Sequence, residues 1–391
     1  MKIEQISSIV NDIHKVVTGV EEDITLDSKN VVDVGKQILD ATDVDNYVKT
    51  LVNRIGKMIF NDRKYTGNGH NVLMDSWEFG SILEKVDCEL PEAVENDSWK
   101  LENGVNFDQD SINKPTVTAK LFNKKVTFEI DVTFAERQVK DSFNSMNDLN
   151  AFMSMIYNAV DKSFTVKLDG LIMATINNMT AKTISSEFKD VTDNNYSNST
   201  GVKAVNLLKL YNDKFTKTLT KDSALTDSDF LKFASMTINN YVERVSKLST
   251  LFNMEGKQRF TPKDDLNLMM LADFKSACSS YLQANTFHKE LVELPNSESV
   301  PYWQGTGRDY SFDCISSINV NIDNGTKTPK NIKTAGIIAV MFDKNAVGVC
   351  NTDRRVTTYY NAKAEFFNNF FKFDCSYLND FSENFVVFFI A

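Results

Sequence analysis

The stretch VTFEIDVTF at residues 126–134 alternates apolar and polar side chains. A period of two over this length predicts a strand with one apolar face and one solvent-facing face. Soon after it comes SMNDLNAFMSMIYNAVDKSFTVKLDGLIMATINNM at residues 145–179, where apolar residues recur every three or four positions. That spacing predicts a helix of about 34 residues and roughly 50 Å, interrupted only by Gly170. A helix about three times the usual length needs a special architectural reason.

The residues before this strand predict a long hairpin. A short strand is expected at 81–90, and a polar, acidic connection comes next at 91–115. Apolar residues alternate again at 117–121, and the break at 122–125 predicts a hairpin turn. A polar connection this long is unusual inside a compact domain. We therefore expect a hairpin between about 80 and 135 whose polar far end leaves the body of its own subunit.

The rest of the chain mixes both kinds of element, which predicts an α+β fold. A polar segment at 185–200 separates the long helix from the C-terminal half of the sequence. Residues 385–390 are apolar throughout, which predicts a strand buried on both faces. The expected helices lie at 42–59, near 202–212, near 227–250 and near 273–283, and the expected strands at 266–271, 318–322, 336–342, 354–360 and 385–390.

Composition excludes several classes of protein. The chain has 391 residues, 43 basic and 53 acidic side chains, and a net charge of −10. A protein that coats duplex DNA needs a basic face, and nothing in the overall charge supplies one. No secretory signal and no apolar run long enough to cross a membrane is found, so we expect a soluble protein made in a cytoplasm. The cysteines are expected to be small buried side chains in a reducing environment, without zinc-ligand spacing; they are Cys88, Cys278, Cys314, Cys350 and Cys375.

The sequence predicts no catalytic, cofactor-binding or metal-binding residue, and no cofactor. Glycine-rich phosphate loops are absent, and His14, His70 and His288 are far apart in the sequence. Carboxylate pairs such as Asp264 with Asp265 are interpreted as solvated surface. The pair Arg354–Arg355, which comes directly after Asp353, is expected to form ion pairs between strands or between subunits. We therefore do not expect an enzyme.

Several segments, taken in order, resemble major capsid proteins of tailed bacteriophages. Residues 126–144 resemble that family's return strand of the extended loop, which leads into the spine helix. The resemblance runs from about residue 70 to residue 391. It is carried by segments of structural character rather than by an active-site motif: Arg259–Asp265, Val300–Phe312, Phe342–Val349, Asp353–Glu365 and Asn379–Phe388.

The resemblance implies the HK-ninety-seven-type capsid fold, an α+β fold with four parts. Carried onto this sequence, it places an N-terminal arm at 1–65 and an extended β-hairpin loop at 66–140. A peripheral domain is expected at 141–200 and 351–383, with the spine helix at 146–179. A mixed α/β axial domain is expected at 201–350 and 384–391.

The resemblance also implies a function. The chain would be a major capsid protein that self-assembles, through hexameric and pentameric capsomers, into an icosahedral or prolate shell around double-stranded DNA. Residues 1–65 are too short for a built-in scaffold, so a separate scaffolding protein is expected. Portal and decoration proteins are further expected partners, and packaged DNA would lie on the inner face without sequence-specific binding. No membrane is involved, and assembly in the bacterial host cytoplasm is expected.

Three other interpretations stay open from the sequence. The same fold builds encapsulin compartments, which enclose enzymes rather than genomes. Another phage structural protein, such as a tail or decoration protein, is a second alternative, although the long helix argues against an all-β tail tube. A cytosolic enzyme of unknown class is the third, and no constellation of residues supports it.

Overall fold

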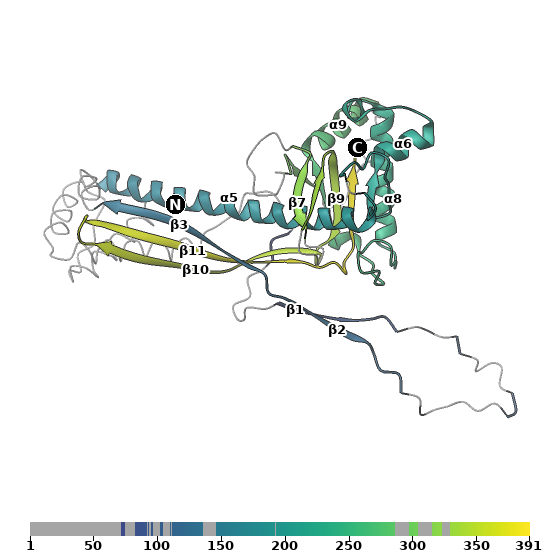
Figure 1. Cartoon of the computed structure of the whole chain (residues 1–391), viewed down its shortest axis with the longest axis horizontal. Coiled ribbons are helices and arrows are strands. Elements are labelled where there is room, and N and C mark those ends of the chain that lie inside the picture. Colours follow the sequence, from purple (N-terminus) through teal and green to yellow (C-terminus); the bar gives the residue numbers. More distant parts are fainter. Residues whose placement is uncertain are drawn as a thin grey trace.

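A computed structural model gives the fold of most of the chain. The helix expected at 42–59 and the three histidines lie outside the residues that it describes. Figure 1 shows an elongated molecule, with a long helix and long strands at one end, a mixed α/β part at the other, and a hairpin reaching away from both. The described residues are 72–74, 83–91, 93, 95–96, 102–104, 110, 112–135, 146–191, 193–285, 297–303, 315–322 and 329–391.

The long helix expected from the sequence is present as α5 (Met146–Glu187). Its 42 residues span roughly 60 Å at about 1.5 Å per residue. It continues past the predicted end at 179 because Ala181 and Ile184 extend the buried stripe at helical spacing. The described apolar positions of that stripe from Ile156 onward are buried.

A three-stranded sheet lies along α5, in the order β10 (Val347–Asn361), β11 (Phe366–Asn379), β3 (Lys125–Ala135). Both pairings are antiparallel. The alternation predicted at 126–134 is confirmed as far as residue 133, where partly buried apolar residues alternate with exposed polar ones. The strand expected at 354–360 is the second half of the longer β10, whereas β11 was not predicted.

A five-stranded sheet in the described part of the chain forms the centre of the α/β part. Its order is β4 (Ala204–Asn206), β12 (Phe385–Phe389), β9 (Ile337–Asp343), β5 (Leu266–Leu271), β6 (Ser297–Val300). All five residues of β12 are buried, which confirms the strand predicted there. The helix expected near 202–212 is partly wrong, because residues 204–206 pair with β12 as a parallel strand before α6 (Leu207–Phe215) begins.

Helices and a small hairpin surround this sheet (Figure 1). The side chain of Asp227 caps α8 (Ser228–Val245), and that of Asn206 caps α6, because each accepts a hydrogen bond from a free N–H of the first turn. The expected helices near 227–250 and 273–283 and the expected strand at 318–322 are confirmed. These elements are α6 (Leu207–Phe215), α7 (Lys221–Ala224), α8 (Ser228–Val245), α9 (Ala272–Asn285), β7 (Ile318–Ile322) and β8 (Lys330–Thr334).

The C-terminal half of α5 joins the two parts of the molecule. It contacts strands of the three-stranded sheet and also β4, β7 and β12. Residues on all sides of this half are therefore buried, and its polar side chains need internal partners. Thr175 donates to the Leu171 carbonyl at 2.7 Å, and the Asn177 amide donates to the Trp303 carbonyl at 2.6 Å.

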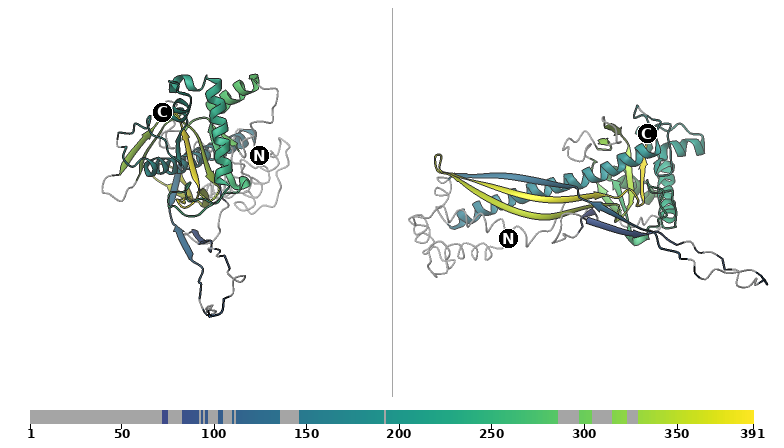
Figure 2. Two further views of the ribbon diagram at one scale, coloured as in Figure 1. Left: turned by 90° about the vertical axis from the view of Figure 1, so that its right-hand side faces the viewer. Right: turned by 60° about the horizontal axis from the view of Figure 1, so that its bottom comes forward.

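The hairpin that reaches away consists of β1 (Leu83–Cys88) and β2 (Val117–Phe122). The two strands are antiparallel, with Leu83 opposite Phe122 and Cys88 opposite Val117. This confirms a hairpin with a long polar connection, whose described residues are exposed. Figure 2 shows that it diverges from the axis of the long strands.

The hairpin turn predicted at 122–125 is wrong. The chain passes from β2 through Asn123 and Lys124 straight into β3, which pairs with β11. The pairing of β3 with β11 runs along the whole of β3 and places its apolar side against α5. A turn at 122–125 would have folded β3 back on β2 and left that apolar side without the helix.

Candidate interaction site on the β1–β2 hairpin

The hairpin has two faces of opposite character. The side chains of Lys85, Asp87, Thr118 and Lys120 point toward the body and are partly buried. The residues between them point outward, and these are mainly apolar. Val86 is 63% exposed and Leu121 is 64% exposed, next to the smaller Ala119. The charged face is thus the inner face, which reverses the usual arrangement of a half-buried strand.

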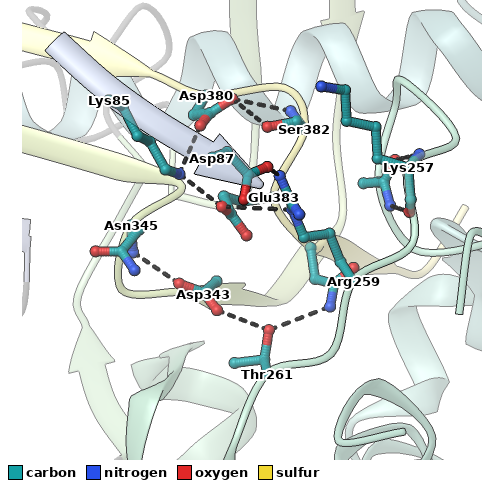
Figure 3. Close-up of polar contacts among 12 residues, drawn as sticks. Lys85, Asp87, Lys257, Arg259, Thr261, Asp343, Asn345, Asp380, Ser382 and Glu383 are labelled. Atoms are coloured by element: carbon teal, nitrogen blue, oxygen red, sulfur yellow. Dashed lines mark hydrogen bonds and ion pairs between the residues drawn. The ribbon is translucent and has the colours of Figure 1, made fainter. Parts of the chain in front are cut away.

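Two lysines, one from each strand, bind the body through carboxylates (Figure 3 shows Lys85). Lys85 Nζ donates to Asp380 Oδ2 at 2.6 Å and to Glu383 Oε1 at 2.5 Å. Lys120 Nζ donates to the second oxygen of Asp380 at 3.0 Å and to Glu255 Oε1 at 2.6 Å. Asp380 therefore connects both strands to the loop between β11 and β12.

A third cation extends the cluster in the opposite direction, from the body to the hairpin. The Arg259 guanidinium forms an ion pair with Asp87 of β1 and lies 3.6 Å from Glu383 Oε1. Nearby, Lys257 Nζ is 3.4 Å from the Thr118 hydroxyl. We call Lys85, Asp87, Lys120, Glu255, Arg259, Asp380 and Glu383 the ionic cluster.

Hydrogen bonds within the body position Asp380, the central carboxylate of the ionic cluster. The Asp380 N–H donates to the Ala346 carbonyl at 2.8 Å, and Asp380 Oδ1 accepts from the Ser382 N–H at 3.0 Å and its hydroxyl at 2.8 Å. Behind it, the Thr261 hydroxyl donates to Asp343 Oδ2 at 2.8 Å. The Asp380 carboxylate is therefore held in place by contacts within the body as well as by the hairpin.

The electrostatics favour the charged forms at both ends of the central ion pair. Burial alone would raise the pKa of Asp380, but hydrogen bonds from Lys85 and Ser382 outweigh it and hold the pKa well below its usual range. Burial alone would lower the pKa of Lys120, but Glu255 and Asp380 outweigh it and the pKa is raised. The two groups thus stay ionised over the whole neutral range.

Other charged residues singled out in the sequence lie elsewhere. Arg355 pairs across strands with Asp374 at 2.6 Å, which confirms the expected inter-strand ion pair. The Arg354 guanidinium instead lies 4.2 Å from the ring centroid of Phe164. Asp265 pairs with Lys344 at 2.6 Å on the surface.

The cysteines only partly match the expectation of burial. Cys350 and Cys375 are buried, Cys278 is half-buried and Cys88 is exposed, and these four carry free thiols. Burial raises the pKa of the Cys375 thiol to about 12. Cys314 lies outside the described residues.

Within the described ranges, His, Cys, Asp and Glu side chains form no group of three suited to hold a metal ion. None of the helices described has both the length and the hydrophobicity that crossing a bilayer requires.

The ionic cluster was not predicted from the sequence. Lys85 and Asp87 lie two positions apart in β1, as do the polar Thr118 and Lys120 in β2, and this spacing was the available signal. Alternation alone does not say which face points inward, and apolar side chains are the usual inner ones. Asp380, Glu383 and Arg259 lie within segments that carry the family resemblance, but the resemblance assigns no pairing to them.

Comparison with known proteins gives the family. The profile of Phi29-like phage major capsid proteins matches residues 6–389. No curated protein has a significantly similar sequence. A chain of the capsid structure of Staphylococcus phage Andhra is 12% identical, with a TM-score of 0.51 over 85% of this chain and 87% of that one. A chain of the cyanophage P-SCSP1u capsid is 10% identical, with a TM-score of 0.48 over 85% and 91%.

At such low identity the Andhra capsid shows a shared fold and no more, while the family match extends over nearly the whole sequence. The family match, and not the shared fold, points to a phage capsid, so an encapsulin is not favoured. The family is structural, which also leaves the tail-protein and enzyme alternatives without support. This chain belongs to the Phi29-like phage major capsid proteins.

Proposed function

We propose that this phage major capsid protein closes an icosahedral or prolate shell from hexameric and pentameric capsomers, and that its β1–β2 hairpin joins neighbouring subunits. One observation carries the proposal: the hairpin is held to its own body by its charged face and leaves its apolar face open. The partner of that face is a second copy of this chain, because a shell protein meets mostly copies of itself.

Physical stability argues for such a partner. A hairpin of two strands is at best marginally stable alone in water. The ionic cluster supports one face, and the outward Val86, Ala119 and Leu121 gain from burial. Removing apolar area from water contributes about 25 cal/mol per Å². Repeated over every subunit of a shell, a modest contact of this kind becomes a large total.

Under this proposal, each part of the capsid fold has its place in the chain. Residues 1–65 form the N-terminal arm and 66–140 the extended loop. Residues 141–200 and 351–383 form the peripheral domain, with α5 as its spine helix. Residues 201–350 and 384–391 form the axial domain around the capsomer centre.

The partners and the setting derive from the same role. A separate scaffolding protein guides assembly in the bacterial host cytoplasm, and portal and decoration proteins complete the particle. The net charge of −10 supports a lining that contacts packaged DNA weakly and without sequence preference. The chain has a structural role and no catalytic one.

The test is the double variant Val86→Ser with Leu121→Ser, compared with Glu84→Gln on the same outer face. The serine variant should keep its circular dichroism and melting temperature as a soluble subunit, but form fewer and less stable shells. Glu84→Gln leaves the apolar surface intact and should assemble normally. Negative-stain electron microscopy and sedimentation read out the shells, and normal shells from the serine variant would refute this role of the hairpin.

A further inference from the structure

The hairpin meets the body in two zones of different chemistry. At its root, Leu83 and Phe122 face each other across the strands. They line a small cavity together with Met74, Gly348 and Leu378. Along the chain from the root, the next inward side chains are Lys85 and Asp87 on β1 and Lys120 on β2, which belong to the ionic cluster.

The root fixes one end of the hairpin, and the ionic cluster holds the hairpin further along its length. The link from β2 to β3 is only Asn123 and Lys124, and the Lys124 carbonyl accepts from the Tyr377 N–H at 3.1 Å. The root is thus tied down close to its connection. Within the described part of the chain, β1 and β2 form a sheet of their own, so no further strand fixes their direction.

The direction of the hairpin therefore depends on side chains beyond the root. The ionic cluster combines three cations with four carboxylates, and Asp380 at its centre has no exposed side-chain surface. Because both lysines point to this one carboxylate from different strands, they fix the hairpin's rotation as well as its tilt.

We infer that the ionic cluster is a conformational clamp that sets the angle of the hairpin before a subunit meets its neighbour. The clamp turns the charged side of β1 and β2 inward and so presents Val86, Ala119 and Leu121 outward in one orientation. This inference rests on the proposed role of the hairpin in assembly, but it concerns the isolated subunit and is tested there.

Attachment through ion pairs differs from attachment through a buried apolar face in how easily the hairpin can separate from the body. The two lysines are 26% and 27% exposed although Asp380 is buried, and ion pairs of partly exposed side chains weaken in salt. An attachment by ion pairs can therefore hold a direction and still release it, whereas a buried apolar face would not separate from the body without unfolding cost.

The experiment measures the distance between the hairpin and the body by pulsed electron spin resonance. One nitroxide is placed on the native Cys88 and one on Met236→Cys, an exposed position of α8. Cys278 and Cys314 are replaced by alanine. The sample is the soluble full-length subunit before assembly.

The lysine contacts on which the clamp depends are removed with the triple variant Lys85→Met, Lys120→Met and Asp380→Asn, while the Arg259–Asp87 ion pair remains. Methionine keeps the aliphatic length of lysine, and asparagine avoids leaving an unpaired charge at a buried position. The single variant Lys120→Met leaves Asp380 paired with Lys85 and serves as a milder test. Lys344→Met breaks a surface ion pair of similar length elsewhere and is the matched control.

A narrow distance distribution is expected in the wild type and in Lys344→Met. The triple variant should give a broader or displaced distribution while its circular dichroism and melting curve keep a folded body, and Lys120→Met should lie between. A distribution as narrow as wild type in the triple variant would overturn the clamp. The proposed function fails separately, if the Val86→Ser, Leu121→Ser variant assembles normally.

Discussion

Cys88 and Cys375 carry the same thiol in opposite environments. Cys88 is exposed on the outer face of the hairpin, whereas Cys375 is buried in β11. A thiol reacts as its thiolate, and burial raises the pKa of Cys375 to about 12, so hardly any thiolate exists there at neutral pH. Cys278 shares this protection in part, because burial raises its pKa too.

This difference predicts the pattern of thiol labelling. In the soluble native subunit at neutral pH, a maleimide should modify Cys88 rapidly, and Cys350 and Cys375 only after denaturation. Peptide mass spectrometry at several labelling times measures it, and Cys88→Ser is the control. Rapid native labelling of Cys375 would contradict the burial of β11.

Residue identity predicted burial well where a strand lies in the core and poorly on the hairpin. Every residue of 385–389 is buried, as its uniform hydrophobicity predicted. Val86 and Leu121 are equally apolar and face solvent. The difference is set by Asp380, Glu383 and Arg259, which attract the charged side of β1 and β2 from distant parts of the chain. No local pattern contains that information.

Among the elements, α5 gives the sharpest prediction about stability. Leu168 is 5% exposed and Val166, two positions away on the same helix, is 46% exposed. Leu168→Asp should lower the free energy of unfolding by about 4 kcal/mol, because it buries an unpaired carboxylate against the sheet. Val166→Asp should cost well under about 1 kcal/mol, as surface substitutions do. Urea unfolding of the soluble subunit compares them, and equal losses would argue against the packing of α5.

The ionic cluster predicts a pH window. The pKa of Asp380 is lowered in the folded state, so its contribution is complete above the unfolded pKa of about 4 and is lost as the pH falls toward the folded value. The raised pKa of Lys120 makes its contribution complete below about 10.5 and lost at higher pH. The ion pairs of Asp380 and Lys120 should therefore persist from mild acid to mild alkali.

Asp380→Asn tests the acid side of this window. Near pH 7 the variant should be less stable by about 3 kcal/mol, as expected when a buried ion pair loses one partner. The difference should stay constant between about pH 5 and 9, and shrink below about pH 4, where Asp380 takes up a proton in the unfolded wild type but stays ionised in the folded one. Urea titrations at each pH measure it. A difference that already disappears at pH 5.5 would mean that Asp380 is not held ionised by its partners.

Elements with strong local periodicity were predicted from sequence, while their connections were not. The long helix and β3 are explained by periods of three to four and of two. Their neighbours in the sheet depend on long-range pairing, and so the turn at 122–125 was misplaced and β11 was missed. In β11 the alternation of phenylalanine with Asn368, Asn369 and Lys372 is irregular, because Asn369 points to the buried side.

At the scale of the whole molecule, the polar end of the hairpin should be separable from folding. Deleting residues 92–113 removes a connection whose described residues are exposed. The subunit should fold with an unchanged melting temperature, but its shells should be fewer or dissociate at lower denaturant concentration. Melting curves and negative-stain images distinguish the two effects. Loss of folding on deletion would count against an extended loop.

The overall charge predicts weak contact with DNA. With a net charge of −10, capsomers should show little affinity for duplex DNA near 150 mM salt, and what binding remains should fall steeply as salt is raised. Fluorescence anisotropy with a labelled duplex, across a salt series, measures this. Tight binding at that salt concentration would contradict a non-adhesive lining.

The position of β12 between β4 and β9 has a consequence for synthesis in the infected cell. β4 pairs only with β12 among the described strands, yet the two are more than 170 residues apart in the chain. Until residue 389 has left the ribosome, β4 has no partner and the apolar edge of β9 is open. Unpaired edges are sites where nascent chains aggregate. Each copy must therefore be translated through β12 before its sheet can close, which separates the making of subunits from the building of shells in time.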